Sequence, residues 1–108
     1  MTCTPEIILS GKHFNISQCT GCQRIGLYYK NLLVGFNPEE FTSFSRLFSE
    51  IDFKMSATVF PDGLGHIVVN TCHQDIQFNF TEAEFEEFRN ILQKALIILR
   101  ANHIIRVK

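Results

Sequence analysis

The chain of 108 residues contains no tryptophan, only three prolines and no long run of apolar residues. Its longest uninterrupted apolar stretch is Ala95–Leu99, far shorter than the roughly 20 residues of a membrane-spanning helix. The first ten residues have neither the basic start nor the apolar core of a secretory signal peptide. These absences argue against a transmembrane helix, and they lead us to expect a cytoplasmic protein that does not bind membranes.

An excess of charge of either sign is also missing, because ten basic residues stand against eleven acidic ones. Affinity for nucleic acid depends largely on clustered lysine and arginine, and neither half of the chain has such a cluster. What is present is an apolar fraction of 45%, with eleven phenylalanines. This composition is enough for one hydrophobic core, so we predict a single domain over residues 1–108.

Two segments carry the signals of a helix start. In the first, Asn37 is a favourable N-cap, Pro38 suits the first helical position, and Glu40 completes a capping box. In the second, Thr81 is the cap and Glu84 closes the box. We therefore predict one helix after each cap.

An apolar stripe at helical spacing follows each of these starts. The first stripe runs from Phe41 to Ile51, and the second runs from Phe85 to Leu99 within a helix predicted over 82–101. The second half of the later helix is apolar around most of its circumference. This pattern favours burial on more than one side or contact with a partner.

The rest of the chain has the alternation and the β-forming residues of strands, bounded by turn residues. The predicted strands are Lys12–Gln18, Gln23–Tyr29, Leu32–Phe36, Met55–Phe60, His66–Cys72 and Ile76–Phe80. Hairpin turns between them place apolar residues on one side of the sheet. The predicted pairs include Tyr29 with Leu32, Ile16 with Ile25, Val59 with Ile67, and Val69 with Phe80. We predict an α+β fold in which one antiparallel sheet of about six strands carries two helices on one face.

The two halves of the chain have the same order of elements, three strands and then a helix. A shift of 44 residues superposes Phe36, Glu40, Phe41 and Phe44 on Phe80, Glu84, Phe85 and Phe88. One interpretation is a duplicated β-β-β-α unit, with repeats at 12–52 and 55–101. The other is convergence, because capping boxes and apolar stripes recur in unrelated helices.

The second face of the predicted sheet is polar but carries few charges. Its candidate binding residues are His13, Asn15, Arg24, Tyr28, His66, Asn70 and Cys72. An antiparallel sheet normally leaves one face in water, so an ordinary solvated face is one interpretation. The shortage of lysine and glutamate favours another, a small non-catalytic domain that uses this face for binding or for forming a homodimer.

Cys19 and Cys22 form a CxxC motif. Without a secretory signal we expect no disulfide framework, so the motif predicts a zinc knuckle, a redox pair or two thiols in an ordinary turn. Zinc needs four ligands, and Cys3, His66 or Cys72 are candidates for the third. A redox pair normally lies at a helix start, and no helix is predicted here. We expect no cofactor other than this zinc.

Residues arranged for catalysis are not apparent in the sequence. Cys72 and His73 are adjacent and would point to opposite faces of a strand, which argues against a catalytic dyad. No glycine-rich loop opens a helix, as phosphate binding requires. We therefore expect a protein that is not an enzyme. Weak binding of single-stranded nucleic acid on the polar face stays open as a further alternative, through Tyr28, Arg24, His13 and Phe60.

Two stretches of the chain, CTGCQRIGLYYKNLLVGFNPEEFTSF and DIQFNFTEAEFEEF, carry a resemblance to known sequences. Together they resemble a family of small uncharacterised bacterial proteins, a domain of unknown function. The resemblance implies a bacterial cytoplasmic source and no known activity. It implies no functional residues.

Overall fold

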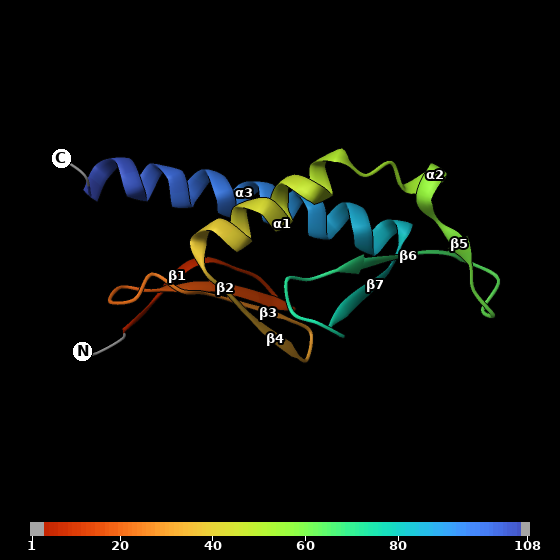
Figure 1. The fold of residues 1–108 in the computed structure, drawn as a ribbon, viewed down its shortest axis with the longest axis horizontal. Coiled ribbons are helices and arrows are strands. Elements are labelled where there is room, and N and C mark those ends of the chain that lie inside the picture. The colour runs from red at the N-terminus through yellow and green to blue at the C-terminus, as the bar shows by residue number, and fades with distance from the viewer. Residues whose placement is uncertain (1–3, 107–108) are drawn as a thin grey trace.

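A computed structural model describes residues 4–106, in which helices lie on one side of two antiparallel sheets (Figure 1). The strands are β1 (Pro5–Ser10), β2 (Phe14–Cys19), β3 (Ile25–Tyr29), β4 (Leu32–Phe36), β5 (Thr58–Val59), β6 (Gly65–Asn70) and β7 (Gln77–Thr81). The helices are α1 (Pro38–Glu50), α2 (Phe53–Ser56) and α3 (Glu82–Arg106). The predicted α+β class with antiparallel strands is confirmed.

The predicted single sheet is wrong, because β1 to β4 form one sheet and β5 to β7 form another. The reason lies at the open edge of β4. There the backbone oxygen of Gly35 accepts a hydrogen bond at 2.5 Å from Nε2 of His73, in the turn between β6 and β7. The imidazole ring therefore takes the Gly35 carbonyl oxygen, to which a further strand would have to donate a hydrogen bond in order to pair with β4.

The first sheet has the predicted register in one hairpin and a shifted register in the next. Tyr29 pairs with Leu32 as predicted. Ile25, however, pairs with Gln18 rather than with Ile16. The four-residue loop begins one residue later than expected and closes at Gln23, whose φ of 67° lies in the left-handed region. Because the shift is by two residues, the same side chains still face the core.

The second sheet has the same two-residue shift. Val69 pairs with Phe78 rather than with Phe80, because the turn spans four residues and closes through Asp75 at a φ of 68°. Val59 likewise pairs with Gly65 rather than with Ile67. The buried face of β6 and β7 is again unchanged by the shift.

One predicted strand, Met55–Phe60, is wrong over most of its length. Its first residues belong to the short helix α2, and only Thr58–Val59 form a strand. The Asp52 side chain accepts a hydrogen bond from the backbone N–H of Lys54 at 3.1 Å and caps this helix. This cap stabilises a helical backbone at the residues where the sequence predicts the start of an extended strand.

β1 was not predicted. Its pairing with β2 is interrupted between Ile7 and Leu9, so the strand has no regular alternation of buried and exposed residues. Ile7 is 63% exposed and Ile8 only 7% exposed. A bulge of this kind interrupts the alternation of apolar and polar residues by which a strand is recognised in a sequence.

Both predicted helix starts are confirmed, and the second helix is longer than predicted. Asn37 and Glu40 form a complete capping box at the start of α1. α3 continues to Arg106 instead of ending near residue 101. Arg89 of α3 also donates hydrogen bonds to the backbone oxygens of Phe48 and Ile51, at 3.2 and 2.6 Å, and so satisfies the end of α1. No helix in residues 4–106 is long and apolar enough to cross a membrane.

The duplication stays a prediction. The order β2, β3, β4, α1 is followed by β5, β6, β7, α3, so each half retains three strands and a helix. The second half differs by its two-residue β5 and by the inserted α2.

Phe88 of α3 lies at the centre of the core, completely buried. Its ring centroid is 4.8 Å from that of Tyr29 in β3 and 4.9 Å from that of Phe80 in β7. Phe48 of α1 lies 5.2 Å away. One side chain thus contacts both sheets and the other long helix.

We expect Phe88→Ala to lower the free energy of unfolding by about 3–5 kcal/mol, because it leaves a cavity where these elements meet. Urea denaturation would measure the loss. The control is Phe60→Ala, which removes a ring that stacks on His66 outside the main core. We expect Phe60→Ala to lower the free energy of unfolding by less than about 1 kcal/mol. Equal losses in the two variants would contradict the central role of Phe88.

Candidate binding surfaces

The face of the four-stranded sheet turned away from the helices is left uncovered by them (Figure 1). The strand register places two rows of side chains across it. The first row is Ile7, Ser17, Gly26 and Gly35, and the second is Ser10, Asn15, Tyr28 and Leu33. We call these eight residues the outer face.

Large apolar side chains are exposed on the outer face. Leu33 is 69% exposed and Tyr28 44% exposed, and Ile7 is comparable to Leu33. Leu33 leans over Gly26, where its Cδ1 lies 3.7 Å from the position that a Cβ would take. Arg24 lies over Gly35 in the same way, at 3.1 Å. The two glycines therefore leave space that these two side chains occupy, and neither row contains a charged residue.

The predicted binding residues do not share one surface. Asn15 and Tyr28 lie on the outer face, and the Arg24 side chain reaches over it. His13 is exposed in the turn between β1 and β2. The remaining three, His66, Asn70 and Cys72, lie in the three-stranded sheet or its turn, which corrects the prediction of one continuous face.

Ile7 and Leu33 were missed. Leu33 had a signal in the sequence, since it alternates with the inward residues Leu32 and Val34. Ile7 had none, because its strand was not recognised.

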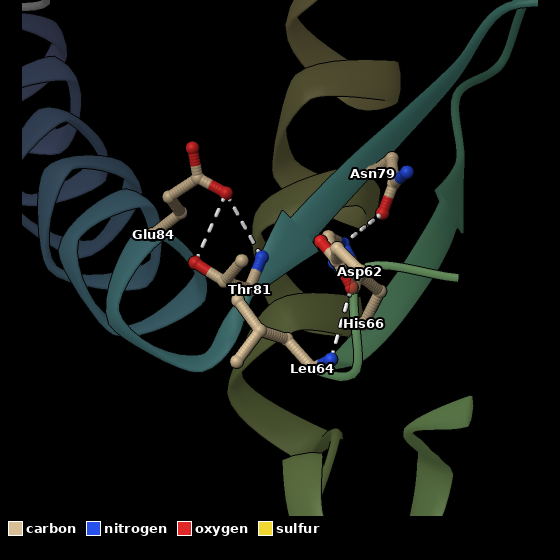
Figure 2. A network of polar contacts seen from close by, with 6 residues as sticks. All are labelled: Asp62, Leu64, His66, Asn79, Thr81 and Glu84. Atoms are coloured by element: carbon tan, nitrogen blue, oxygen red, sulfur yellow. Dashed lines mark hydrogen bonds and ion pairs between the residues drawn. The ribbon is translucent and has the colours of Figure 1, made fainter. Parts of the chain in front are cut away.

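His66 is the centre of a polar network on the three-stranded sheet (Figure 2). Its Nε2 lies 2.7 Å from a carboxylate oxygen of Asp62, and its Nδ1 lies 2.9 Å from the amide oxygen of Asn79. The second carboxylate oxygen of Asp62 accepts a hydrogen bond from the Leu64 N–H. Phe60 stacks on the imidazole ring at 4.4 Å between centroids.

Two oxygen acceptors facing both ring nitrogens favour the doubly protonated imidazolium form of His66. The hydrogen bond to Asp62 raises the pKa of His66, and that to Asn79 adds to the effect. The pKa of Asp62 is lowered, first by the Leu64 N–H and then by His66. With both nitrogens engaged, the network closes the β5–β6 turn and leaves the ring no nitrogen with which to activate a nucleophile.

The two cysteines of the CxxC motif lie close together at the β2–β3 turn. The backbone N–H of Cys22 donates to Sγ of Cys19 at 3.3 Å. Cys19 is disulfide-bonded, so the motif is not a pair of free thiols in this structure. Cys22 is exposed.

Among the described residues, the structure brings neither His66 nor Cys72 to this turn. His66 is held by Asp62 and Asn79, and Cys72 lies in the β6–β7 turn. Burial and then the nearby Glu40 carboxylate raise the pKa of the Cys72 thiol. Cys3 lies outside the described residues. Within residues 4–106, no three His, Cys, Asp or Glu side chains are placed to share a metal ion.

Comparison with known proteins gives a family and no function. A family model described as "Family of unknown function (DUF6686)" matches residues 1–96. No curated protein and no solved structure matches the chain.

The His66–Asp62 contact should make the β5–β6 turn sensitive to pH. Because the pKa of folded His66 is raised, its contribution is complete below the ordinary value of 6.5 and is lost as pH rises through the folded pKa. Because the pKa of Asp62 is lowered, its contribution is present above 3.8 and is lost as pH falls through the folded pKa. Both contributions are therefore complete between these two values.

An NMR titration of the His66 ring in the wild type and in Asp62→Asn would measure this effect. Asparagine retains an oxygen for the Leu64 N–H but removes the charge. We expect the pKa of His66 to fall toward 6.5 in the variant. An unchanged His66 midpoint would show that the carboxylate does not hold the imidazolium.

Proposed function

The chain belongs to DUF6686, a family of unknown function, and from that premise we propose that it is a non-catalytic binding domain. Its binding surface is the outer face of the four-stranded sheet. Its partner there is a second copy of the same chain.

The exposed apolar residues of the outer face support this proposal most strongly. Leu33 and Tyr28 are neighbours in one row, and Ile7 lies in the next. Together they expose apolar surface among residues that carry no charge. An apolar patch without interleaved charges is a common feature of interaction surfaces, because burying it on a partner removes it from water.

A second copy suits this surface better than a charged partner does. The Leu33 and Arg24 side chains lie over Gly26 and Gly35, and two sheet faces can pack on one another. A two-fold axis would set the row of Tyr28 and Leu33 from one copy against the small residues of the other. The eight residues of the outer face carry no charge, and Arg24 lies over Gly35, so two copies would bring few like charges together.

The size of the face indicates a weak dimer. Four strands about 4.8 Å apart, each contributing some five residues at about 3.4 Å, cover on the order of 300 Å². Stable complexes bury about 800 Å² per partner. We therefore propose an association that depends strongly on protein concentration.

Single-stranded nucleic acid is the weaker alternative for this face. Platforms that bind it combine several stacking rings with a positive groove. The outer face offers one ring, Tyr28, and one nearby cation, Arg24. The chain as a whole carries a formal net charge of −1.

Zinc binding by Cys19 and Cys22 is a second proposal. The observation that favours it is the hydrogen bond from the Cys22 N–H to the Cys19 sulfur, since such N–H groups stabilise metal-bound thiolates. A disulfide sulfur is not a thiolate, so binding requires reduction of Cys19 first.

Sedimentation equilibrium over a range of concentrations tests the dimer. We expect the wild type to shift from monomer toward dimer as concentration rises and Leu33→Lys to remain monomeric, because the lysine places a charge within the contact. The matched control is Val68→Lys, on the exposed face of the other sheet and 46% exposed. It should associate as the wild type does. A wild type that stays monomeric, or equal effects of the two variants, would contradict the proposal.

Native mass spectrometry of protein purified under reducing conditions tests the zinc proposal. We expect about one zinc per chain in the wild type and in Cys72→Ser, and none in Cys22→Ser, because Cys22 belongs to the motif and Cys72 does not. Absence of zinc from the reduced wild type would rule out this site. So would loss of zinc from the Cys72 variant.

A further inference from the structure

A cleft of about 540 Å³ lies on the helix side of the four-stranded sheet, away from the outer face. One wall is the C-terminal half of α3, which runs over this sheet (Figure 1). The opposite wall is the first part of α1, at Pro38 and Thr42. The ends of β2 and β3 form the floor. Its volume lies in the range of roughly 300–1,000 Å³ that is typical of small-molecule sites.

The walls of the cleft are largely apolar. Leu96, Leu99 and Ile104 of α3 face Ile25 of β3 across it. Leu96 and Leu99 are only partly buried, although they pack against the core. The cleft therefore presents aliphatic surface that an alkyl chain would remove from water.

The polar groups of the cleft favour a ligand with an anionic end. Arg100 and His103 line it, and no acidic side chain does so among the described residues. Arg100 has no ion pair with a carboxylate in the described part of the chain. The start of α1, the positive end of that helix, lies on the opposite wall.

A buried amide also opens toward the cleft. Gln18 lines it and is only 8% exposed. Its Nε2 donates to the backbone oxygen of Gln23 at 3.0 Å, which holds the amide in place at the floor of the cleft.

We propose that this cleft binds an amphipathic monocarboxylate of the fatty-acid type. The alkyl chain lies between Leu96, Leu99 and Ile25, and the carboxylate pairs with Arg100. A peptide suits the cleft less well, because its backbone amides would find few polar partners along the aliphatic walls.

The proposal is independent of the dimer. The cleft lies on the face of the sheet opposite the outer face, so self-association could fail without affecting it. Much of its α3 wall, from Leu99 to Ile104, lies beyond the residues that match the family model. The proposal therefore concerns this chain and not the family.

Isothermal titration calorimetry with dodecanoate, below its aggregation concentration, tests the site. Dodecanol and dodecyltrimethylammonium are the matched ligands, with the same chain and a neutral or a cationic end. We expect saturable binding of dodecanoate at one site, with the other two weaker by about tenfold or more, because a charge-assisted hydrogen bond to Arg100 is lost. Equal binding of the three, or uptake of dodecanoate that does not saturate, would overturn the proposal.

Two pairs of variants locate the binding. Ile104→Asp places an acid in the cleft, whereas Ile105→Asp changes the next residue, which is 69% exposed and does not line it. Arg100→Gln removes the proposed partner, and Lys94→Gln removes an exposed charge elsewhere on α3. We expect the first member of each pair to weaken dodecanoate about tenfold and the second to leave it unchanged.

Circular dichroism would establish that all four variants are folded. Because the changed side chains are mostly exposed, we expect the same helical signal in each. Retained binding in folded Ile104→Asp and Arg100→Gln would place the ligand elsewhere and overturn the proposal.

Discussion

Aromatic packing around Phe88 joins two sheets that have no strand pairing between them. Tyr29 brings the four-stranded sheet to this ring, and Phe78 and Phe80 bring the three-stranded sheet. Phe48 adds α1. The sheets share no strand pairing, so their relative position depends mainly on side-chain packing in this one core. Removing large apolar side chains such as these aromatic rings from water is the dominant favourable contribution to folding.

The same packing decides where the molecule can bind. Both sheets turn their apolar side toward the helices, and the opposite side of each is left open. α3 has 25 residues and is therefore about 38 Å long, roughly twice the length of a six-residue strand. It covers both sheets in turn, and its far half forms a wall of the apolar cleft. Helices cover only one side of the four-stranded sheet. Its other side is therefore an open face, and the cleft lies on the side where α3 and α1 pack.

The sequence predicted the local elements more successfully than their arrangement. Asn37 and Glu40 identify the start of α1, because a capping box involves neighbours in the chain. The inward side of β3 was also predicted, since alternation survives a register shift of two residues. The partner of Ile25 was not, because the turn that sets it depends on the left-handed backbone of Gln23.

The candidate sites show the same division. Tyr28 was placed on an exposed face by alternation alone, whereas His66 was placed on that face and lies in a different sheet. The sequence by itself determined the two helix starts, the α+β class and the inward side of most strands. Only the tertiary structure decided that there are two sheets, that Asp62 and Asn79 enclose His66, and that α3 and α1 form the walls of a cleft. The reason is the separation along the chain of the residues that interact. Capping and alternation act between neighbours, whereas sheets and clefts depend on how turns close and how distant side chains pack.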